Sequence, residues 1–351
     1  MTPAELSRTV LRAVRRAVDD GELDAAVCTA GQRVVVERPR AGGTGDYATN
    51  VALQLARPAG RPPRQVAEIL SRRLGDSPGI EDVVVTGPGF LNFRMAEPGA
   101  ASGALVAEIL GGGHRYGFAE EATGQAVRLH APRDVRALVV MDAVGRLLRS
   151  QGVSVRTVCA GAPDPEWADL LGVRVDDVGE AEPGDIDIRP VPAPADPTPL
   201  GRDAARWALL HPAGHDHPRI GAEHLDRREA NPLFRVQYAH ARSRALTRNA
   251  ADLGFTAAPG DVPGQQDLLA ALADHPRILR AAAERHAPDR LARHLVSVAD
   301  TFLAELHPSV LPQGEEKPSA AHRARLALAE AVGTVLAGGL TLLGIDAPAH
   351  L

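Results

Sequence analysis

Residues Asn231–Asn249 read NPLFRVQYAHARSRALTRN, and this stretch decides how the C-terminal part of the chain is interpreted. Asn231 is a good helix cap, and Pro232 suits the first turn of a helix, where no amide donor is required. Apolar or small residues then recur every three or four positions, which predicts one buried helical face: Val236, Ala239, Ser243, Leu246 and Ala250. A core helix with solvated arginines accounts for this pattern. The polar or small run at 237–240 is unusual, because ordinary patterning would place leucine there.

The composition is that of a globular chain. Its 351 residues suffice for two or three domains, and its hydrophobic content is 44% with a mean hydropathy of -0.12. No apolar run approaches the ~20 residues of a membrane span, and the N-terminal stretch predicts an amphipathic helix rather than a signal peptide. Cys28 and Cys159 lie far apart, so neither a disulfide framework nor a cysteine metal cage is indicated. We expect a cytoplasmic protein without membrane contacts.

Almost all the basic residues are arginine, since Lys317 is the only lysine among 39 lysines and arginines. A mechanism that needs a lysine elsewhere in the chain is therefore excluded. The net charge of -5 argues against a protein that coats nucleic acid generally. Any anion-binding face has to be a local patch.

The first third predicts a small α+β unit with an antiparallel sheet. Its pattern predicts helices over 4–19, 51–56 and 64–74, a short strand over 33–38, and paired strands over 81–86 and 90–95. Three motifs follow one another here: GDYATNVALQLA at 45–56, GRPPRQVAEIL at 60–70 and GPGFLNFRM at 87–95. The glycine run at 111–113 is interpreted as a linker, which closes a first domain over residues 1–118.

Together these motifs resemble the N-terminal additional domain of bacterial arginyl-tRNA synthetases, which in that family contacts the elbow of tRNA. The resemblance implies an RNA-facing surface shaped by five residues: Asp46, Tyr47, Asn50, Asn92 and Phe93. The alternative is structural. In that interpretation Asp46 and Asn50 cap a helix at Tyr47, and Phe93 fills the core.

In the resembled family a nucleotide-binding domain of Rossmann type follows, and here it would span residues 125–230. Its HIGH motif binds ATP phosphates at a helix N-terminus, and a lysine of its KMSKS motif neutralises charge on the α-phosphate. In this sequence APRD, at 131–134, stands where HIGH belongs, and His130 becomes the first histidine only with a one-residue gap. Asp134 would also repel the phosphates. His130, Arg133 and Asp134 therefore form a degenerate ATP site.

The segment 160–199 is acidic and rich in proline and glycine, and it occupies the place of most of such a domain. It predicts one short helix around Trp167 and one strand over 185–189, with no KMSKS-like loop. The shortened scaffold leaves little to hold ATP even if Arg133 or Arg136 replaced the lysine. We expect no cofactor, because ATP binding would be lost.

A histidine cluster follows in a proline- and glycine-containing loop: His211, His215, His217 and His224. The loose spacing and the absence of cysteine favour a solvent-exposed loop over a zinc site, so no metal is predicted.

The stretch ANPLFRVQYAHAR at 230–242 is very close to NPVYYVQYAHAR, which opens the helical anticodon-binding domain of the resembled family. Further helices are predicted over 265–272, 276–283, 289–306 and 323–343, so residues 231–351 should form an all-α bundle of the DALR type. Candidate RNA contacts in it are Arg235, Gln237, Tyr238, Arg242, Arg290 and Arg293.

A basic band in this domain adds to the RNA-binding prediction: Arg277, Arg280, Arg285, His286, Arg290, Arg293 and His294. Tyr238, Phe234 or Phe302 would supply a ring on which an unpaired base stacks. Six acidic residues interleave between Asp261 and Asp300, so a solvated face of mixed charge is the alternative.

The predicted fold is thus multidomain α+β, with a small α+β N-terminal domain, a truncated Rossmann-like α/β remnant and an all-α C-terminal helical bundle. The leading hypothesis is an inactive paralogue that binds tRNA(Arg), or a tRNA-like RNA, without charging it, and no catalytic residue is assigned. One alternative is residual or altered activity, as an arginine-tRNA ligase or an arginyl-tRNA-dependent transferase. The other is an interaction module that partners a synthetase or another protein.

Overall fold

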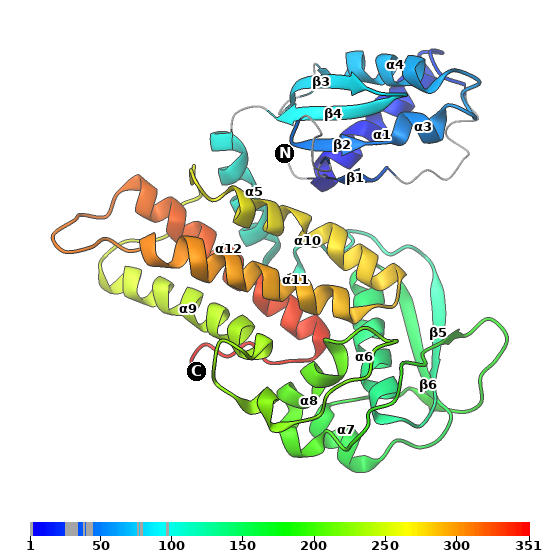
Figure 1. Ribbon diagram of the computed structural model, residues 1–351, viewed down its shortest axis with the longest axis vertical. Helices are drawn as coiled ribbons and strands as arrows, with labels where there is room; N and C mark the ends of the chain where they lie inside the picture. Colours follow the sequence, from blue (N-terminus) through cyan, green and yellow to red (C-terminus); the bar gives the residue numbers. More distant parts are fainter. Residues whose placement is uncertain are drawn as a thin grey trace. The chain divides into compact units, whose positions relative to one another are not determined.

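The computed structural model describes residues 3–24, 34–37, 39, 45–75, 77, 80–95 and 98–351 (Figure 1). The chain divides into two compact units, Met1–Leu105 (unit 1) and Val106–Leu351 (unit 2). Cys28 and the ends of the strand predicted over 33–38 lie outside the described residues.

Unit 1 contains the predicted antiparallel sheet. Its strands are β1 (Val36–Glu37), β2 (Tyr47–Thr49), β3 (Ile80–Thr86) and β4 (Phe90–Met95), in the order β1-β2-β4-β3. The helices are α1 (Pro3–Asp19), α3 (Val51–Leu55), α4 (Pro63–Gly75) and α5 (Pro98–Gly112), the last of which runs into unit 2. Leu91 and Phe93 alternate along β4 and are fully buried against apolar residues of α1, α3 and α4, so one face of the sheet forms the core.

One alternative and one prediction for this part of the chain are wrong. The alternative in which Asp46 and Asn50 cap a helix at Tyr47 fails, because Tyr47–Thr49 pairs with β4 and Asp46 accepts a hydrogen bond from the Met95 amide at 2.8 Å. Asn50 does occupy the N-cap of α3, but its side chain makes no capping bond. The predicted linker at 111–113 is also helical, since α5 ends at Gly112 and a 3-10 turn, η1 (Gly113–Arg115), follows.

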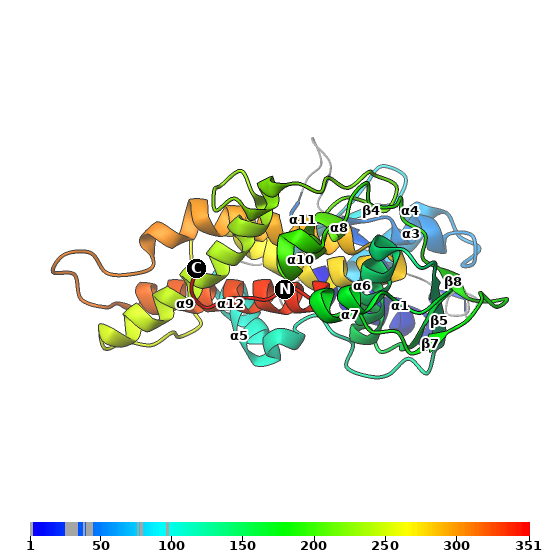
Figure 2. The ribbon, with the colours of Figure 1, turned by 90° about the horizontal axis from the view of Figure 1, so that it is seen from below.

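The middle of the chain, although short, still forms a parallel sheet. Strands β5 (Ala126–Ala131), β6 (Ser154–Cys159), β7 (Asp177–Val178) and β8 (Ile186–Asp187) are arranged in the order β7-β6-β5-β8. Helix α6 (Val135–Ser150) connects β5 to β6, and α7 (Pro165–Leu171) lies at the position predicted around Trp167. In Figures 1 and 2 this sheet lies at one end of unit 2, and the C-terminal helices extend away from it.

The two faces of the parallel sheet differ in chemistry. Leu129, Ala131 and Cys159 are fully buried on one face, the side on which Val155 approaches Gly145 of α6. The alternate residues make polar pairs across the strands: Arg128 with Asp185 at 2.5 Å and Arg156 with Asp177 form ion pairs, and His130 hydrogen-bonds with Asp187. Val158 also lies on this second face and is fully buried, so the second face combines charged pairs with an apolar residue.

The C-terminal residues form the predicted helical bundle. Its helices are α8 (Gly201–Leu210), α9 (Pro232–Asp252), α10 (Gln266–Glu284), α11 (Pro288–Thr301) and α12 (Ala320–Leu343). Shorter turns are η2 (Thr198–Leu200), η3 (Ala222–Leu225), the π-helical turn η4 (Phe302–Leu306) and η5 (His307–Ser309). The two helices predicted over 265–272 and 276–283 are one, α10, with Pro276 inside it.

Helix α12 forms the centre of this bundle. It is long and apolar enough to cross a membrane, with a hydropathy of 1.8, so the expectation that no such run exists is wrong. However, 83% of the 18-residue stretch of α12 with this hydropathy is buried inside the protein, as in the core helix of a globular bundle. Glycines allow close packing here, because a Cβ at Gly338 would lie 2.8 Å from the carbonyl oxygen of His114.

A buried arginine joins the parallel sheet layer to the bundle. Arg206 of α8 is fully buried and forms an ion pair with Asp142 of α6 at 2.6 Å. It also donates to the carbonyl oxygens of Leu343, at the end of α12, and Leu171, at the end of α7, both at 2.8 Å. Burial lowers the pKa of Arg206, but a guanidinium stays protonated at neutral pH. One cation thus fixes four helices.

Asp142 also binds a second arginine, Arg146, which reaches the C-terminal end of α12. Arg146 donates to Asp142 at 3.0 Å and to the carbonyl oxygen of Thr341 at 3.2 Å. Gly344 ends α12 in the left-handed conformation, and a Cβ there would collide with the guanidinium of Arg206. Arg206 therefore satisfies the Leu343 carbonyl group, which the end of α12 leaves without a helical donor, and Arg146 adds a second hydrogen bond to the Thr341 carbonyl, which also accepts from the Gly344 amide at 3.0 Å.

We predict that Arg206→Met lowers the free energy of unfolding by about 3 kcal/mol or more, because it leaves two buried carbonyl oxygens and part of the Asp142 carboxylate without partners. Urea denaturation would measure the loss. Arg146→Met is the matched control: its side chain is 31% exposed, so we expect a loss of less than about 1 kcal/mol. Equal losses in the two variants would contradict the central role of Arg206.

Three rings are packed together where η1 meets the bundle. Tyr116 stacks on His275 with ring centroids 5.9 Å apart, and His275 lies 5.2 Å from His294. His275 Nδ1 and His294 Nε2 are buried and have no hydrogen-bond partner among the described residues. Burial lowers the pKa of His294 to about 4 and that of His275 well below its usual value.

This cluster predicts a loss of stability in acid. Between about pH 6.5 and pH 4 the unfolded chain binds more protons at these histidines than the folded chain does, so the free energy of unfolding falls as the pH decreases. Urea titrations across this range should show the decrease, and His294→Leu should make it shallower. An unchanged pH dependence in that variant would contradict a neutral, buried His294.

Candidate functional site

The start of α6 corresponds to the degenerate ATP site predicted from the sequence. Asp134 is the N-cap residue of α6, and its Oδ1 accepts a hydrogen bond from the Ala137 amide at 2.9 Å. The first turn of a helix attracts anions, and here the chain's own carboxylate takes that position. A phosphate group would have to displace Asp134 and would meet its charge.

The two arginines beside this helix start are engaged by the protein itself. Arg133 donates to the carbonyl oxygen of Ala162 at 2.7 Å. Arg136 is fully buried and donates to five carbonyl oxygens, those of Val191, Leu209, Pro212, Ala213 and Asp216. Burial lowers its pKa. Arg136 therefore organises the segment that follows the sheet and has no donor left for a phosphate, whereas Arg133 is exposed and is engaged only through Nε.

His130 is held in the sheet by an acidic neighbour. Its side chain is 3% exposed, and its Nδ1 lies 3.2 Å from Asp187 Oδ1 on the adjacent strand. The hydrogen bond with His130 is the main reason why the pKa of Asp187 is lowered. Since Asp187 also accepts from Arg189 at 2.8 Å, this histidine belongs to the charged face of the sheet.

The candidate RNA contacts of unit 1 do not form a single surface. Phe93 is fully buried, and Tyr47 packs partly against the same core. Asn92 is buried, and its amide donates to Thr86 Oγ1 at 2.7 Å and to the Val84 carbonyl oxygen at 3.3 Å, which fixes the β3–β4 hairpin. Asn50 is exposed and accepts from the Gln54 side chain at 2.9 Å.

The aromatic residue exposed in unit 1 is Phe90, which sequence reasoning missed. It is 40% exposed, and Val84, 38% exposed, lies on the same face of the β3–β4 pair. Alternation along β4 would have identified it, because Leu91 and Phe93 face the core and Phe90 and Asn92 therefore face away.

The unusual polar run on α9 has a structural explanation. Gln237 Nε2 donates at 3.0 Å both to Asp203 of α8 and to the carbonyl oxygen of Asp346. His240 Nδ1 donates to the carbonyl oxygen of Pro348 at 2.9 Å. These two side chains hold the residues after α12 along α9, which is why polar groups stand where leucine is usual.

Three planar side chains form a ladder on the exposed side of α9, and we name it the α9 platform: Phe234, Tyr238 and Arg242. The rings of Phe234 and Tyr238 stack with centroids 5.6 Å apart, and the Arg242 guanidinium lies 5.9 Å from the Tyr238 centroid. Arg242 donates through Nε to His307 Nε2 at 2.9 Å. Tyr238 is 37% exposed, so the platform presents a ring to solvent.

The basic residues predicted to contact RNA differ in whether they form ion pairs within the protein. Arg235 forms an ion pair with Asp300 at 2.7 Å, and Arg293 with Asp289 at 3.1 Å. Arg290 is exposed, and no ion pair of its guanidinium occurs among the described residues. In the band, Arg277 pairs with Asp274 at 2.9 Å, and the His294 ring belongs to the buried cluster near η1. Phe302 is fully buried and presents no face to a base.

The loop histidines are separated by their contacts. His211 stacks on Trp207 with centroids 5.1 Å apart, and His224 lies 2.9 Å from the carbonyl oxygen of Arg219. His215 is exposed. These contacts belong to a surface loop, and no group of three or more metal ligands occurs in the described part of the chain.

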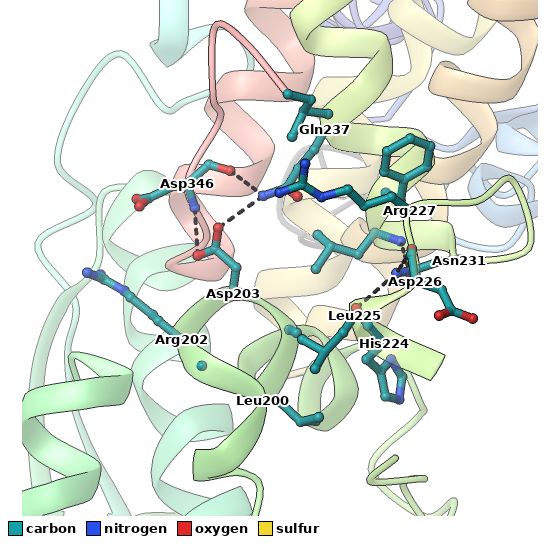
Figure 3. Close-up of a pocket in the computed structure, with 15 residues that line it drawn as sticks. Leu200, Arg202, Asp203, His224, Leu225, Asp226, Arg227, Asn231, Gln237 and Asp346 are labelled. Carbon is teal, nitrogen blue, oxygen red and sulfur yellow. Dashed lines mark hydrogen bonds between the residues drawn. The ribbon is translucent and has the colours of Figure 1, made fainter. Parts of the chain in front are cut away.

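A pocket of about 380 Å³ lies between α8, η3 and α9, and we name it the α8–α9 pocket (Figure 3). Its floor carries the hydrogen bonds among Asp203, Gln237 and Asp346. Burial is the main cause that raises the pKa of Asp203. Asn231 shapes the side of the pocket by donating to the carbonyl oxygens of His224 and Asp226, both at 2.9 Å.

Comparisons with known proteins identify both ends of the chain. Residues 5–95 match the family described as arginyl tRNA synthetase N terminal domain, and residues 236–351 match the DALR anticodon binding domain. The fold is similar to that of the arginyl-tRNA synthetase of Thermus thermophilus, with a TM-score of 0.67 at 16% identity over 100% of both chains.

Relatives align with the chain from end to end. It is 28% identical to an arginine–tRNA ligase of Frankia alni and 27% identical to one of Renibacterium salmoninarum, over 100% of each chain. The Frankia alignment spans 557 positions and this chain has 351 residues, so at least 206 positions (557 minus 351) have no counterpart here, and the missing length is internal. Two domain matches in the expected order and these relatives place the chain in the arginyl-tRNA synthetase family.

Proposed function

We propose that this protein binds tRNA, with tRNA(Arg) as the expected ligand, and does not activate arginine with ATP. The proposed lack of arginine activation rests on the N-terminus of α6. There Asp134 caps the helix, and Arg133 and Arg136 donate to backbone carbonyl groups. Adenylation needs cations that face the α-phosphate. Of the two arginines at this edge, Arg136 is buried and fully engaged, and the exposed Arg133 stands beside the carboxylate of Asp134, which would oppose a phosphate. A cytoplasmic location is part of the proposal.

Membership of the family and the DALR domain support tRNA binding. Two features of the described residues add chemical support. Phe90 in unit 1 and the α9 platform in unit 2 expose aromatic rings, and single-stranded RNA is recognised largely by stacking unpaired bases on such rings. Arg290 has a free guanidinium for backbone phosphates. The candidate contacts are therefore Phe90, Tyr238, Arg242 and Arg290.

The other two functions make different demands. An arginyl-tRNA-dependent transferase would need a nucleophile activated by a neighbouring base. Among the described strand residues His130 contacts Asp187, but the His130 side chain is 3% exposed and is therefore not accessible as such a base. A protein-interaction module would bind its partner after nuclease treatment. Binding that requires RNA would therefore distinguish our proposal from a protein-interaction module.

We predict that the purified protein retains tRNA(Arg) at least tenfold more tightly than unrelated tRNAs in filter binding, and that its affinity falls as salt increases. It should show no exchange of pyrophosphate into ATP in the presence of arginine and tRNA(Arg), with an active arginine–tRNA ligase as the positive control. Equal, weak retention of all tRNAs would contradict the binding half of the proposal, and measurable exchange would contradict the other half.

We also predict that Tyr238→Ala weakens tRNA binding about tenfold, since a stacked base contributes about 1–3 kcal/mol. Tyr238→Phe should bind almost as the wild type does, because the ring is kept. Leu253→Ala, at the other end of α9 and 54% exposed, is the control for loss of an exposed apolar side chain. If Tyr238→Ala and Leu253→Ala bind alike, the α9 platform does not stack a base.

A further inference from the structure

The turn η1 is held against the bundle by close backbone contacts. A Cβ at Gly338 of α12 would lie 2.8 Å from the carbonyl oxygen of His114, and one at Gly117 would lie 3.0 Å from the backbone of α10. Gly117 has a φ of +84°, a left-handed conformation that favours glycine. Gln151, at the end of α6, donates to the Gly117 carbonyl oxygen at 3.2 Å. Three helices thus hold residues 113–117, which we name the η1 latch.

A proline in α10 creates the seat for Tyr116 of the latch. The carbonyl oxygen of Leu272 would accept a helical hydrogen bond from residue 276, but Pro276 has no N–H. The Tyr116 hydroxyl donates to that oxygen at 3.4 Å, and Tyr116 is 5% exposed. The latch therefore supplies a donor that the interrupted helix lacks, and the ring that carries it stacks on His275.

The stack of rings under the latch is compatible only with neutral histidines. His275 lies between Tyr116 and His294, and His275 Nδ1 and His294 Nε2 have no hydrogen-bond partner among the described residues. In a neutral imidazole such a nitrogen can remain an unused acceptor. Protonation turns both ring nitrogens into donors, and a buried donor without an acceptor carries its full desolvation cost.

The charged groups around the stack do not replace the missing partners. Burial is the main reason why the pKa of His294 is lowered; Asp274 of α10 acts against it, but Asp274 pairs with Arg277, which acts with burial. After burial, the group that lowers the pKa of His275 is His294 of α11. From the latch itself the neighbour is Tyr116, whose hydroxyl is uncharged at neutral and mildly acidic pH.

Movement of the latch is the easiest way to bring water to the stack. Separation of α10 from α11 would instead expose leucines that are fully buried. They come from both helices: Leu268, Leu272, Leu279, Leu291 and Leu295. In the latch, by contrast, Tyr116 is the buried residue, and the turn is only three residues long. Opening the latch therefore uncovers less apolar surface than opening the bundle.

We propose that the η1 latch is proton-sensitive: it stays seated on α10 while His275 and His294 are neutral, and a proton on either ring opens it while the bundle remains folded. Helix α5 runs from unit 1 into unit 2 and leads directly into η1. The latch thus makes the attachment of this connection to the bundle dependent on pH. This inference does not depend on RNA binding.

Hydrogen exchange of the full chain between pH 7 and pH 5, corrected for the intrinsic effect of pH on exchange, tests the proposal. The amides of Tyr116, Phe118 and Ala119 report on the latch, because they donate to the carbonyl oxygens of Gly113, Arg115 and Ser150. Their opening should increase about tenfold or more, since an exposed histidine, with a pKa of about 6.5, gains a proton that the buried rings resist.

Low concentrations of urea distinguish local opening from unfolding. Urea should accelerate exchange of the core amides of α12 and leave the latch amides unchanged, because a local opening exposes little surface. The proposal is overturned if exchange of the latch amides responds to urea as α12 does, or if their opening is the same at pH 7 and pH 5.

Three variants separate the seat of the latch from its proton sensitivity. Tyr116→Phe keeps the ring but loses the hydrogen bond to Leu272, so the latch should open several-fold more often at each pH with the same increase in acid. His275→Leu should make the increase smaller. His215→Leu is the matched control, because the His215 side chain is 86% exposed and lies outside the stack. If all three variants exchange as the wild type does, the latch is not seated by Tyr116 and not controlled by His275.

Discussion

The contact between Arg206 and Asp142 is the interaction on which the architecture of unit 2 depends. Asp142 belongs to α6, the helix that covers the parallel sheet. Arg206 pairs with Asp142 and also donates hydrogen bonds to carbonyl oxygens at the ends of α7 and α12. A buried ion pair is weak evidence for stability by itself, but it specifies one arrangement strongly, because any other leaves a charge and two carbonyl groups without partners. The sheet layer and the helical bundle are thus one folding unit despite their different chemistry.

Arginines that donate to backbone carbonyl groups also stabilise the middle of the chain. Arg136 satisfies five carbonyl oxygens of the segment between the sheet and α9, and Arg133 secures the turn after β6. The Arg136 guanidinium is thus fully engaged by the chain's own backbone and is not available to a phosphate. In a protein with one lysine, guanidinium groups are suited to this task, since each has five N–H donors in a fixed plane.

Much of the fold was predictable from local patterns, and the errors have identifiable causes. The helices over 4–19 and 64–74, the β3–β4 pair and the bundle follow from periodicity. Strand β2 was missed because three residues carry no period and only their pairing with β4 makes them a strand. Pro276 predicts a helix boundary, but α10 continues through it. The alternation of β4 predicts that Phe90, and not Phe93, faces solvent. The roles of Gln237 and Arg136 have no local signal, because their partners are at least 34 and 55 residues away. The α8–α9 pocket has no sequence signal, since its walls come from four separate segments.

The charged face of the parallel sheet has a consequence for how this shortened domain relates to its longer relatives. Doubly wound sheets carry helices on both faces, over apolar strands. Here Arg128, Arg156 and His130 with their acidic partners occupy the second face. Two of these groups are already covered, since the side chains of His130 and Asp185 are 3% and 7% exposed, whereas Arg156 is 66% exposed. A helix packed over β6 on this face would bury the Arg156–Asp177 ion pair, at a cost of several kcal/mol per ion. The ion pair on β6 therefore opposes a second helical layer over this part of the sheet.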